Sequence, residues 1–208
     1  MLVAGVALLV AHNAVVAVVH SEVIMLLVNL AFAAVMTGWA YRQGLHRNEV
    51  IGRLRWRSAV AASAAAAVVV ASILVAIQVG LLPPKGETMA LAPGELWFRL
   101  LVGIPVGTAL CEELIFRGVL LAAWDSVVRR PASTAATSAM FGLWHVAAEA
   151  QRLGGFSAAM LSGVAATTAV SAFVLCPLRR RTGDLVAPTV LHSTVNAGIL
   201  ASFVFASS

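Results

Sequence analysis

Residues 109–118 read ALCEELIFRG, so two adjacent carboxylates and one arginine interrupt an otherwise apolar run. A charged side chain near the centre of a bilayer costs about 2.5–3.5 kcal/mol on insertion scales, so these three must compensate one another or face a protein-lined cavity. If the segment is helical, Glu113 and Arg117 lie four positions apart on one face and can pair, whereas Glu112 points about 100° away. Glu112 is then a free carboxylate, and the stretch is a candidate functional site.

The composition of the whole chain is that of an integral membrane protein. Of its 208 residues, 61% are apolar and 11% are charged, and the mean hydropathy is +0.94. Ordinary soluble domains are about 45–50% apolar. Long runs of Ala, Val and Leu without two-residue alternation favour membrane helices over the strands of a barrel. We therefore expect an all-α, polytopic membrane helical bundle that forms one integral membrane domain.

Seven apolar segments are candidate transmembrane helices, because a spanning helix needs about 20 residues. The first lacks the positively charged start of a secretory signal and is interpreted as a retained helix. Segment 96–128 would be about 50 Å long if wholly helical, which exceeds the hydrocarbon core, so it must tilt, break or emerge. Gly103, Pro105 and Gly107 predict a kink within it. The seven segments are residues 1–19, 23–41, 58–82, 96–128, 132–148, 156–176 and 185–205.

Basic residues gather on one side of this seven-span arrangement. The loop at residues 42–57 is rich in arginine, and further basic turns lie at residues 129–130 and 179–181. Because Lys and Arg in short loops mark the cytoplasmic side, we expect a cytoplasmic N-terminus and an outer C-terminus. The net charge of +5 then reports topology. The expected partner is the lipid bilayer rather than nucleic acid. Alternatively, the loop at residues 42–57 binds lipid head groups or an acidic partner.

Three polar groups fall on three different apolar segments, each far from its loops. The i, i+4 spacing in the last of them puts an imidazole and a carboxamide on one helical face. A carboxylate, two imidazoles and a carboxamide supply a base for water and donors for a developing oxyanion, which is what peptide hydrolysis needs. The groups are Glu112-Glu113 with Arg117, Phe141 with His145, and His192 with Asn196.

Other polar residues of the apolar segments have plainer explanations. His12 and Asn13 are better explained by interhelical hydrogen bonds than by a place in the site. Cys111 and Cys176 are better explained as two buried thiols than as a disulfide or a nucleophilic pair.

The motifs EExxxR, FxxxH and HxxxN, in this order on separate segments, resemble those of the CAAX protease and bacteriocin-processing family of intramembrane endopeptidases, which includes the type II CAAX prenyl proteases. All three motifs are intact. The resemblance covers residues 96–205, whereas the helices of residues 1–95 carry no recognised signature. It implies a glutamate-dependent endopeptidase in which Glu112, helped by His145, activates water. His192 and Asn196 would polarise the scissile carbonyl, and Glu113 with Arg117 would form a structural ion pair.

The resemblance leaves the cofactor and the substrate open. Members have also been described as metalloproteases, and Glu112, His145 and His192 would make a His₂Glu zinc set. The closely spaced HExxH motif of zinc peptidases is absent, so we expect no required cofactor, with zinc as the alternative. The expected substrates are membrane-associated proteins or peptides, with CAAX-type chains among them. The short loops fit a multi-pass protein of a bacterial cell membrane.

Two readings from other classes compete with the protease. A transporter or proton-pathway protein also buries Glu, His and Arg between helices, although it would more often show two matching halves. A non-catalytic relative, such as a bacteriocin-immunity or scaffold protein, would keep the fold without the reaction. The intact motif residues favour the protease over both.

Overall fold

The computed structural model describes residues 2–16, 18–19, 21–53, 55–78, 91–152 and 157–205. These residues form helices and turns, with one isolated β-bridge between Gly52 and Asp184, so the all-α prediction is confirmed. The elements are α1 (Leu2–Val16), α2 (Glu22–Arg42), α3 (Arg47–Val50), α4 (Trp56–Gln78), α5 (Pro93–Phe98), η1 (Arg99–Leu110), α6 (Cys111–Glu113), η2 (Leu114–Leu120), α7 (Leu121–Asp125), α8 (Arg130–Arg152), α9 (Ala158–Thr182) and α10 (Val186–Phe205).

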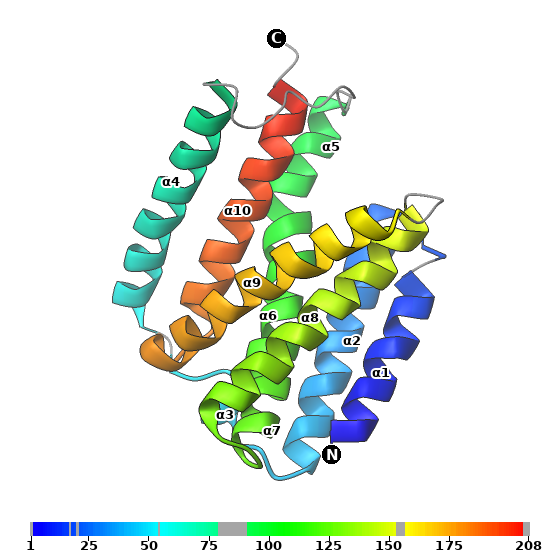
Figure 1. The fold of residues 1–208 in the computed structure, drawn as a ribbon, viewed down its shortest axis with the longest axis vertical. Helices are drawn as coiled ribbons and strands as arrows, with labels where there is room; N and C mark the ends of the chain where they lie inside the picture. The colour runs from blue at the N-terminus through cyan, green and yellow to red at the C-terminus, as the bar shows by residue number, and fades with distance from the viewer. Residues whose placement is uncertain are drawn as a thin grey trace.

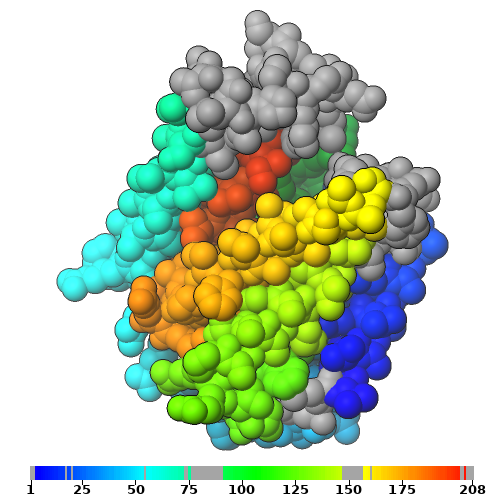
Figure 2. Space-filling model, in the orientation of Figure 1, coloured from blue at the N-terminus to red at the C-terminus, as the bar shows by residue number. Residues whose placement is uncertain are grey.

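The continuous helical run from α5 to α7 lies in the middle of the bundle, and the longer helices pack around it (Figure 1). Helix α2 packs against η1 and η2, and α10 packs against η1 on another side. Helices α8 and α9 pair with each other, as α4 pairs with α10. Figure 2 shows α8 and α9 lying across one face of the molecule, where they cover much of the central run. Glu112 and Glu113, in the middle of this run, are both buried.

The central run changes its hydrogen-bonding pattern instead of breaking. Residues Arg99–Leu110 and Leu114–Leu120 are π-helical, and the single α-helical turn Cys111–Glu113 lies between them. Pro105 lies inside η1 and cannot donate a backbone hydrogen bond. The kink predicted at residues 103–107 thus takes the form of a wider helix. Such π segments are frequent at functional sites, and here both carboxylates follow directly.

Two predicted boundaries are wrong. The polar loop expected at residues 149–155 begins as helix, because α8 continues through strong helix formers to Arg152. The crossing expected to end at Cys176 continues as helix through Pro177 to Thr182, although Pro177 cannot donate a backbone hydrogen bond there. Gly183, with φ 74°, ends that helix in the left-handed conformation that glycine adopts without strain. The turn predicted at residues 83–86 lies outside the described residues.

Two of the described helices are long and apolar enough to cross a membrane by length and composition, namely Glu22–Arg42 and Leu161–Thr182. Shorter apolar stretches lie at Val3–Val16, Trp56–Ser72 and Val186–Ala201. Large apolar side chains stand exposed on several of these helices, including Val3, Leu27 and Phe173. Contact between such side chains and water is unfavourable, whereas contact with lipid is not. The count of seven spans stays a prediction.

The basic turns lie at one end of the bundle, together with the start of α1 (Figure 1). Some of their arginines tie one turn to another. Arg180 donates to both carboxylate oxygens of Asp125, at 2.7 and 3.0 Å, and Arg179 donates to the backbone carbonyl of Glu49 at 2.9 Å. Burial raises the pKa of Asp125, but the hydrogen bonds from Arg180 and Ser133 and the charge of Arg180 outweigh it and hold that pKa below its usual value.

Helices α8 and α9 approach each other at backbone distance. A Cβ atom on Gly142 would lie 2.6 Å from the carbonyl oxygen of Ala165 and 3.0 Å from the Cβ atom of Ala169. Small residues allow this kind of close approach between membrane helices, where dispersion contacts replace the hydrophobic effect.

Cysteine labelling tests the prediction that the basic end faces the cytoplasm. Arg181 is exposed at this end, and the native Cys111 and Cys176 are buried, so they should react little. Because short arginine-rich loops stay cytoplasmic, Arg181→Cys should react with a membrane-impermeant maleimide in inside-out vesicles and not in right-side-out vesicles.

The matched control is Val18→Cys, which is exposed in the turn after α1 and should show the reverse pattern. If the two variants exchanged patterns, the predicted topology would be inverted.

Candidate functional site

Glu113 is the residue on which the other charged groups converge. Its Oε1 atom lies 3.0 Å from Nη1 of Arg117, one turn further along the same run, and accepts a hydrogen bond from Nδ1 of His192 on α10 at 2.8 Å. The side chains of Glu113 and Arg117 are both 0% exposed. The predicted pair is therefore present, and it has a third member that the spacing did not indicate.

Arg117 is held by charge and by an aromatic ring more than by hydrogen bonds. Its contact with Glu113 lacks hydrogen-bond geometry, and none of its three guanidinium nitrogens donates to a described residue. Its Cζ atom lies 4.3 Å from the ring centroid of Phe141 on α8. A desolvated cation over an aromatic face gains about 2 kcal/mol. Phe141 thus explains why an aromatic residue begins the FxxxH motif here.

Glu112 lies on the turn facing two imidazoles. Its Oε2 atom is 3.7 Å from Nε2 of His145 and 3.7 Å from Nε2 of His192. The residue is buried, and this oxygen accepts no hydrogen bond from the part of the chain that the structure describes. The structure thus brings together a carboxylate and two imidazoles from three different helices, as the sequence predicts.

The hydrogen bonds made by Nδ1 of His145 and Nδ1 of His192 leave Nε2 of each ring facing Glu112. Nδ1 of His145 lies 2.9 Å from the carbonyl oxygen of Phe141, which can only accept, so Nδ1 donates. Nδ1 of His192 donates to the Glu113 carboxylate. Both Nε2 atoms are therefore the ones directed at Glu112, and each carries a lone pair when its ring is neutral.

Asn196 is less closely tied to this group. It lies one turn beyond His192 on α10 and is partly exposed. Within the described ranges its side chain makes no hydrogen bond with the protein. The carboxamide is therefore free of protein partners there, while sharing a helix with one of the two imidazoles.

Zinc would need Glu112, His145 and His192 to converge on one ion. Among the described residues, no group of three or more His, Cys, Asp or Glu side chains is arranged to hold a metal ion. The 3.7 Å separations bring Glu112 near each imidazole without giving the three side chains such an arrangement. The expectation of no required cofactor, with zinc as its alternative, stays a prediction.

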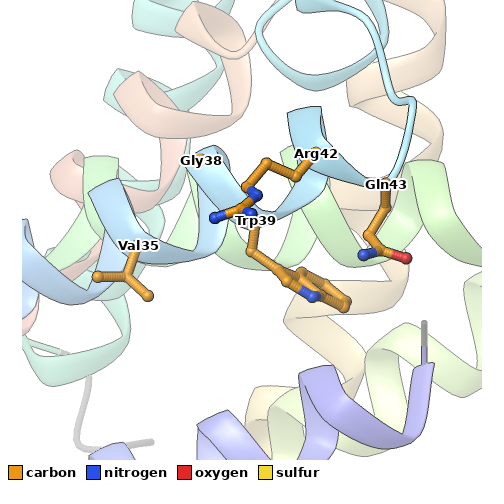
Figure 3. Close-up of a pocket in the computed structure, with 5 residues that line it drawn as sticks. All are labelled: Val35, Gly38, Trp39, Arg42 and Gln43. Carbon is orange, nitrogen blue, oxygen red and sulfur yellow. The ribbon is translucent and has the colours of Figure 1, made fainter.

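A cavity of about 330 Å³ at the basic end of the bundle reaches Arg117. Asp125, Arg179 and Arg180 are among its lining residues. A larger hollow of about 520 Å³ runs along α2 and is lined by Val35, Gly38, Trp39, Arg42 and Gln43, none of which belongs to the predicted site (Figure 3). The side chain of Arg117 is itself 0% exposed, and Glu112, Glu113, His145 and His192 do not line the cavity at the basic end.

The first two helices contribute polar contacts beside this group. His12 contacts Asn29 at 3.0 Å, and Asn13 donates to the backbone carbonyl of Trp144 at 3.2 Å. The interhelical interpretation of His12 and Asn13 is confirmed. Asn29 was missed by the sequence analysis, although an asparagine within an apolar segment is itself a signal for such a contact.

Residues 93–198 match the sequence model of the family described as type II CAAX prenyl endopeptidase Rce1-like. The chain belongs to this family. The match contains all three motifs and confirms the resemblance on which the site residues were predicted. Comparison with curated proteins and with solved structures gives no match.

Membership of the Rce1-like family makes the chain a membrane protein related to CAAX-type proteases, for which a peptide or protein substrate is implied. The match begins at residue 93, the start of α5, and ends within α10. Helices α1, α2, α3 and α4 lie before the matched region, yet all four contact it directly.

Removal of Arg117 should act on stability. Arg117→Ala leaves the Glu113 carboxylate buried without its cation, and breaking a buried pair in this way costs about 3–5 kcal/mol. The variant should melt far below the wild type in detergent, or accumulate poorly in membranes.

Arg181→Ala, which removes an exposed arginine, is the matched control and should change the free energy of unfolding by about 0.5 kcal/mol or less. An Arg117→Ala protein that melted with the wild type yet was inactive would move Arg117 into the reaction itself.

Proposed function

We propose that this protein is a glutamate-dependent intramembrane endopeptidase that hydrolyses peptide bonds of membrane-associated proteins or peptides. The observation that carries the proposal is the position of Glu112 Oε2, a buried carboxylate oxygen 3.7 Å from two imidazole nitrogens. Family membership supports the reaction class. Substrates ending in a CAAX-type sequence are the first to test.

Water activation is assigned to Glu112 and His145. Two acceptors, a carboxylate oxygen and a lone pair on Nε2, cannot hydrogen-bond to each other directly, so a proton donor between them satisfies both. In the proposed reaction this donor is the attacking water. Its oxygen bonds to the scissile carbonyl carbon while Glu112 takes its proton, and that proton then passes to the leaving amine as the C–N bond breaks.

Carbonyl polarisation is assigned to His192 and Asn196. Because Nδ1 of His192 donates to Glu113, its Nε2 can donate to an oxyanion only when the ring is an imidazolium. The neighbouring carboxylates of Glu113 and Glu112 stabilise that charge. The Asn196 amide supplies a second, neutral donor on the same helical face. Glu113 thus supports the reaction through His192 as well as compensating Arg117.

Approach from the cytoplasmic side is part of the proposal. Arg117 is among the residues that line the 330 Å³ cavity at the basic end, and it contacts Glu113, but Glu112, His145 and His192 do not line that cavity. A polar chain can be accommodated more readily at this end than among the apolar faces of the bundle. We propose a multi-pass protein of a bacterial cell membrane, in keeping with its short loops.

The transporter alternative and the non-catalytic alternative fit the site less well. A proton pathway needs a chain of titratable groups leading across the membrane, whereas the described titratable side chains of the site form one compact group. A scaffold has no need of a carboxylate oxygen that lies 3.7 Å from imidazole nitrogens of two other helices. Peptide hydrolysis that requires Glu112 would distinguish the protease from both alternatives.

Glu112→Gln should remove nearly all hydrolysis and leave the protein folded. The amide keeps the shape of the side chain but cannot accept the proton of water, and a general base contributes about 10²–10⁴-fold. Turnover of a membrane-anchored fluorogenic peptide library by the purified protein measures this directly.

Hydrolysis should also survive treatment with a chelator, because the proposed reaction has no metal-dependent step.

The control for Glu112→Gln is Glu95→Gln, which lies in α5 outside the group and should keep the wild-type rate. More than about a tenth of wild-type turnover in Glu112→Gln would rule out Glu112 as the base.

Asn196→Ala should lower kcat with little change in KM, because the amide acts on the oxyanion and not on the ground-state carbonyl. Removing one such donor costs about 10²–10³-fold in turnover. The double variant with His192→Ala should fall far short of the product of the two single effects, because the two donors act as a unit. An unchanged kcat with a raised KM would assign Asn196 to substrate binding instead.

A further inference from the structure

A polar chain runs from α1 through α2 to the central run. Nε2 of His12 donates to Oδ1 of Asn29 at 3.0 Å, and Nδ2 of Asn29 donates to the backbone carbonyl of Gly107 at 2.9 Å. His12 is 5% exposed. Both side-chain groups of Asn29 are hydrogen-bonded, whereas Nδ1 of His12 is buried and bonds to none of the described residues.

The chain ends just before the turn that carries Glu112. Gly107 lies in the π-helical segment η1, which ends at Leu110, and Glu112 lies in the α-helical turn that follows. A Cβ atom on Gly107 would lie 3.0 Å from Cδ1 of Leu26, so α2 approaches the run closely there. Asn29 therefore binds the backbone of the central run five residues before the proposed catalytic base.

A second branch leads from α1 to the neighbour of His145. The His12 ring stacks between Phe32, at 4.1 Å and 24°, and Trp144, at 5.8 Å and 25°. Asn13 donates to the carbonyl of Trp144 at 3.2 Å. The Trp144 and His145 rings lie 5.2 Å apart. Consecutive residues of α1 thus hold the turn of α8 on which His145 lies.

We infer that His12, Asn13 and Asn29 are positioning residues that set the separation of Glu112 and His145, and this inference rests on the proposed function. The pair itself makes no direct hydrogen bond, since its atoms are 3.7 Å apart. Its distance is therefore fixed by the helices that carry it, and the three polar residues bind both of these helices next to the pair. This gives the first two helices, which lie before the matched family region, a part in the reaction.

The kinetic test compares Asn29→Leu and His12→Phe with Thr37→Val. Asn29→Leu removes both bonds of the chain, and His12→Phe keeps an aromatic ring for stacking but loses the bond to Asn29. Thr37 lies on the same helix, and its buried hydroxyl bonds to none of the described residues, so Thr37→Val is a near-isosteric control. Loss of an outer hydrogen-bond partner at a site costs about 10–100-fold, and a misplacement of about 1 Å costs about 10²-fold.

We expect kcat to fall by about 10–100-fold in Asn29→Leu and His12→Phe with KM within about twofold, and to stay unchanged in Thr37→Val. The pH profile of kcat should shift in the first two, because the interaction of Glu112 with His145 changes. A merely structural role would lower the amount of folded protein without moving that profile. A reduced rate with an unmoved profile, or an unchanged kcat, would overturn the inference.

A second measurement does not depend on protease activity. A hydrophobic carbodiimide modifies protonated buried carboxyls, and peptide mass spectrometry separates modification at Glu112 from that at Glu113. The pH midpoint of Glu112 modification should shift in folded Asn29→Leu or His12→Phe and stay in place in Thr37→Val. A shift in a protein that hydrolyses no peptide would support the positioning role and refute the proposed function, whereas an unmoved midpoint would refute the positioning role.

Discussion

Burial of the Glu113 carboxylate beside Arg117 is the constraint on which the rest of the site depends. Both side chains are 0% exposed in a bundle built largely of apolar residues. Neither charge is tolerable alone at this depth. The carboxylate therefore takes a second partner in His192, and the guanidinium takes the face of Phe141, so one buried ion pair draws α8 and α10 onto the central run.

This arrangement separates two adjacent carboxylates into different chemical environments. Glu113 is compensated by a cation and a hydrogen bond, whereas Oε2 of Glu112 has neither from the described residues. The one-residue step along a helix, about 100°, is enough to make this difference. His192 connects the two environments, since one of its nitrogens faces each glutamate. Pairs of titratable groups with such contrasting surroundings are typical of acid–base sites.

The sequence was sufficient for the parts of the site that lie on one helix. The Glu113 and Arg117 pair followed from an i, i+4 spacing, and Glu112 was singled out because that spacing left it unpaired. Contacts between helices could not be derived in the same way, because periodicity describes one helix at a time. The bond from His192 to Glu113 and that from Asn29 to Gly107 depend on how helices distant in the sequence are packed. The π-helical hydrogen-bonding pattern could not be predicted either, because Pro105 and its flanking glycines indicate that the helix is irregular but not how.

The close approach of α8 and α9 has a consequence for how the family's signature should be written. Gly142 stands at the first variable position of the FxxxH motif, and a methyl group there would meet the Ala165 carbonyl at 2.6 Å. In chains that share this helix contact, that position admits only glycine unless the neighbouring helix moves away. A search pattern that allows any residue there would therefore accept sequences whose FxxxH helix has to pack differently. The residue between the aromatic and the histidine carries information about architecture, even though it takes no part in the chemistry.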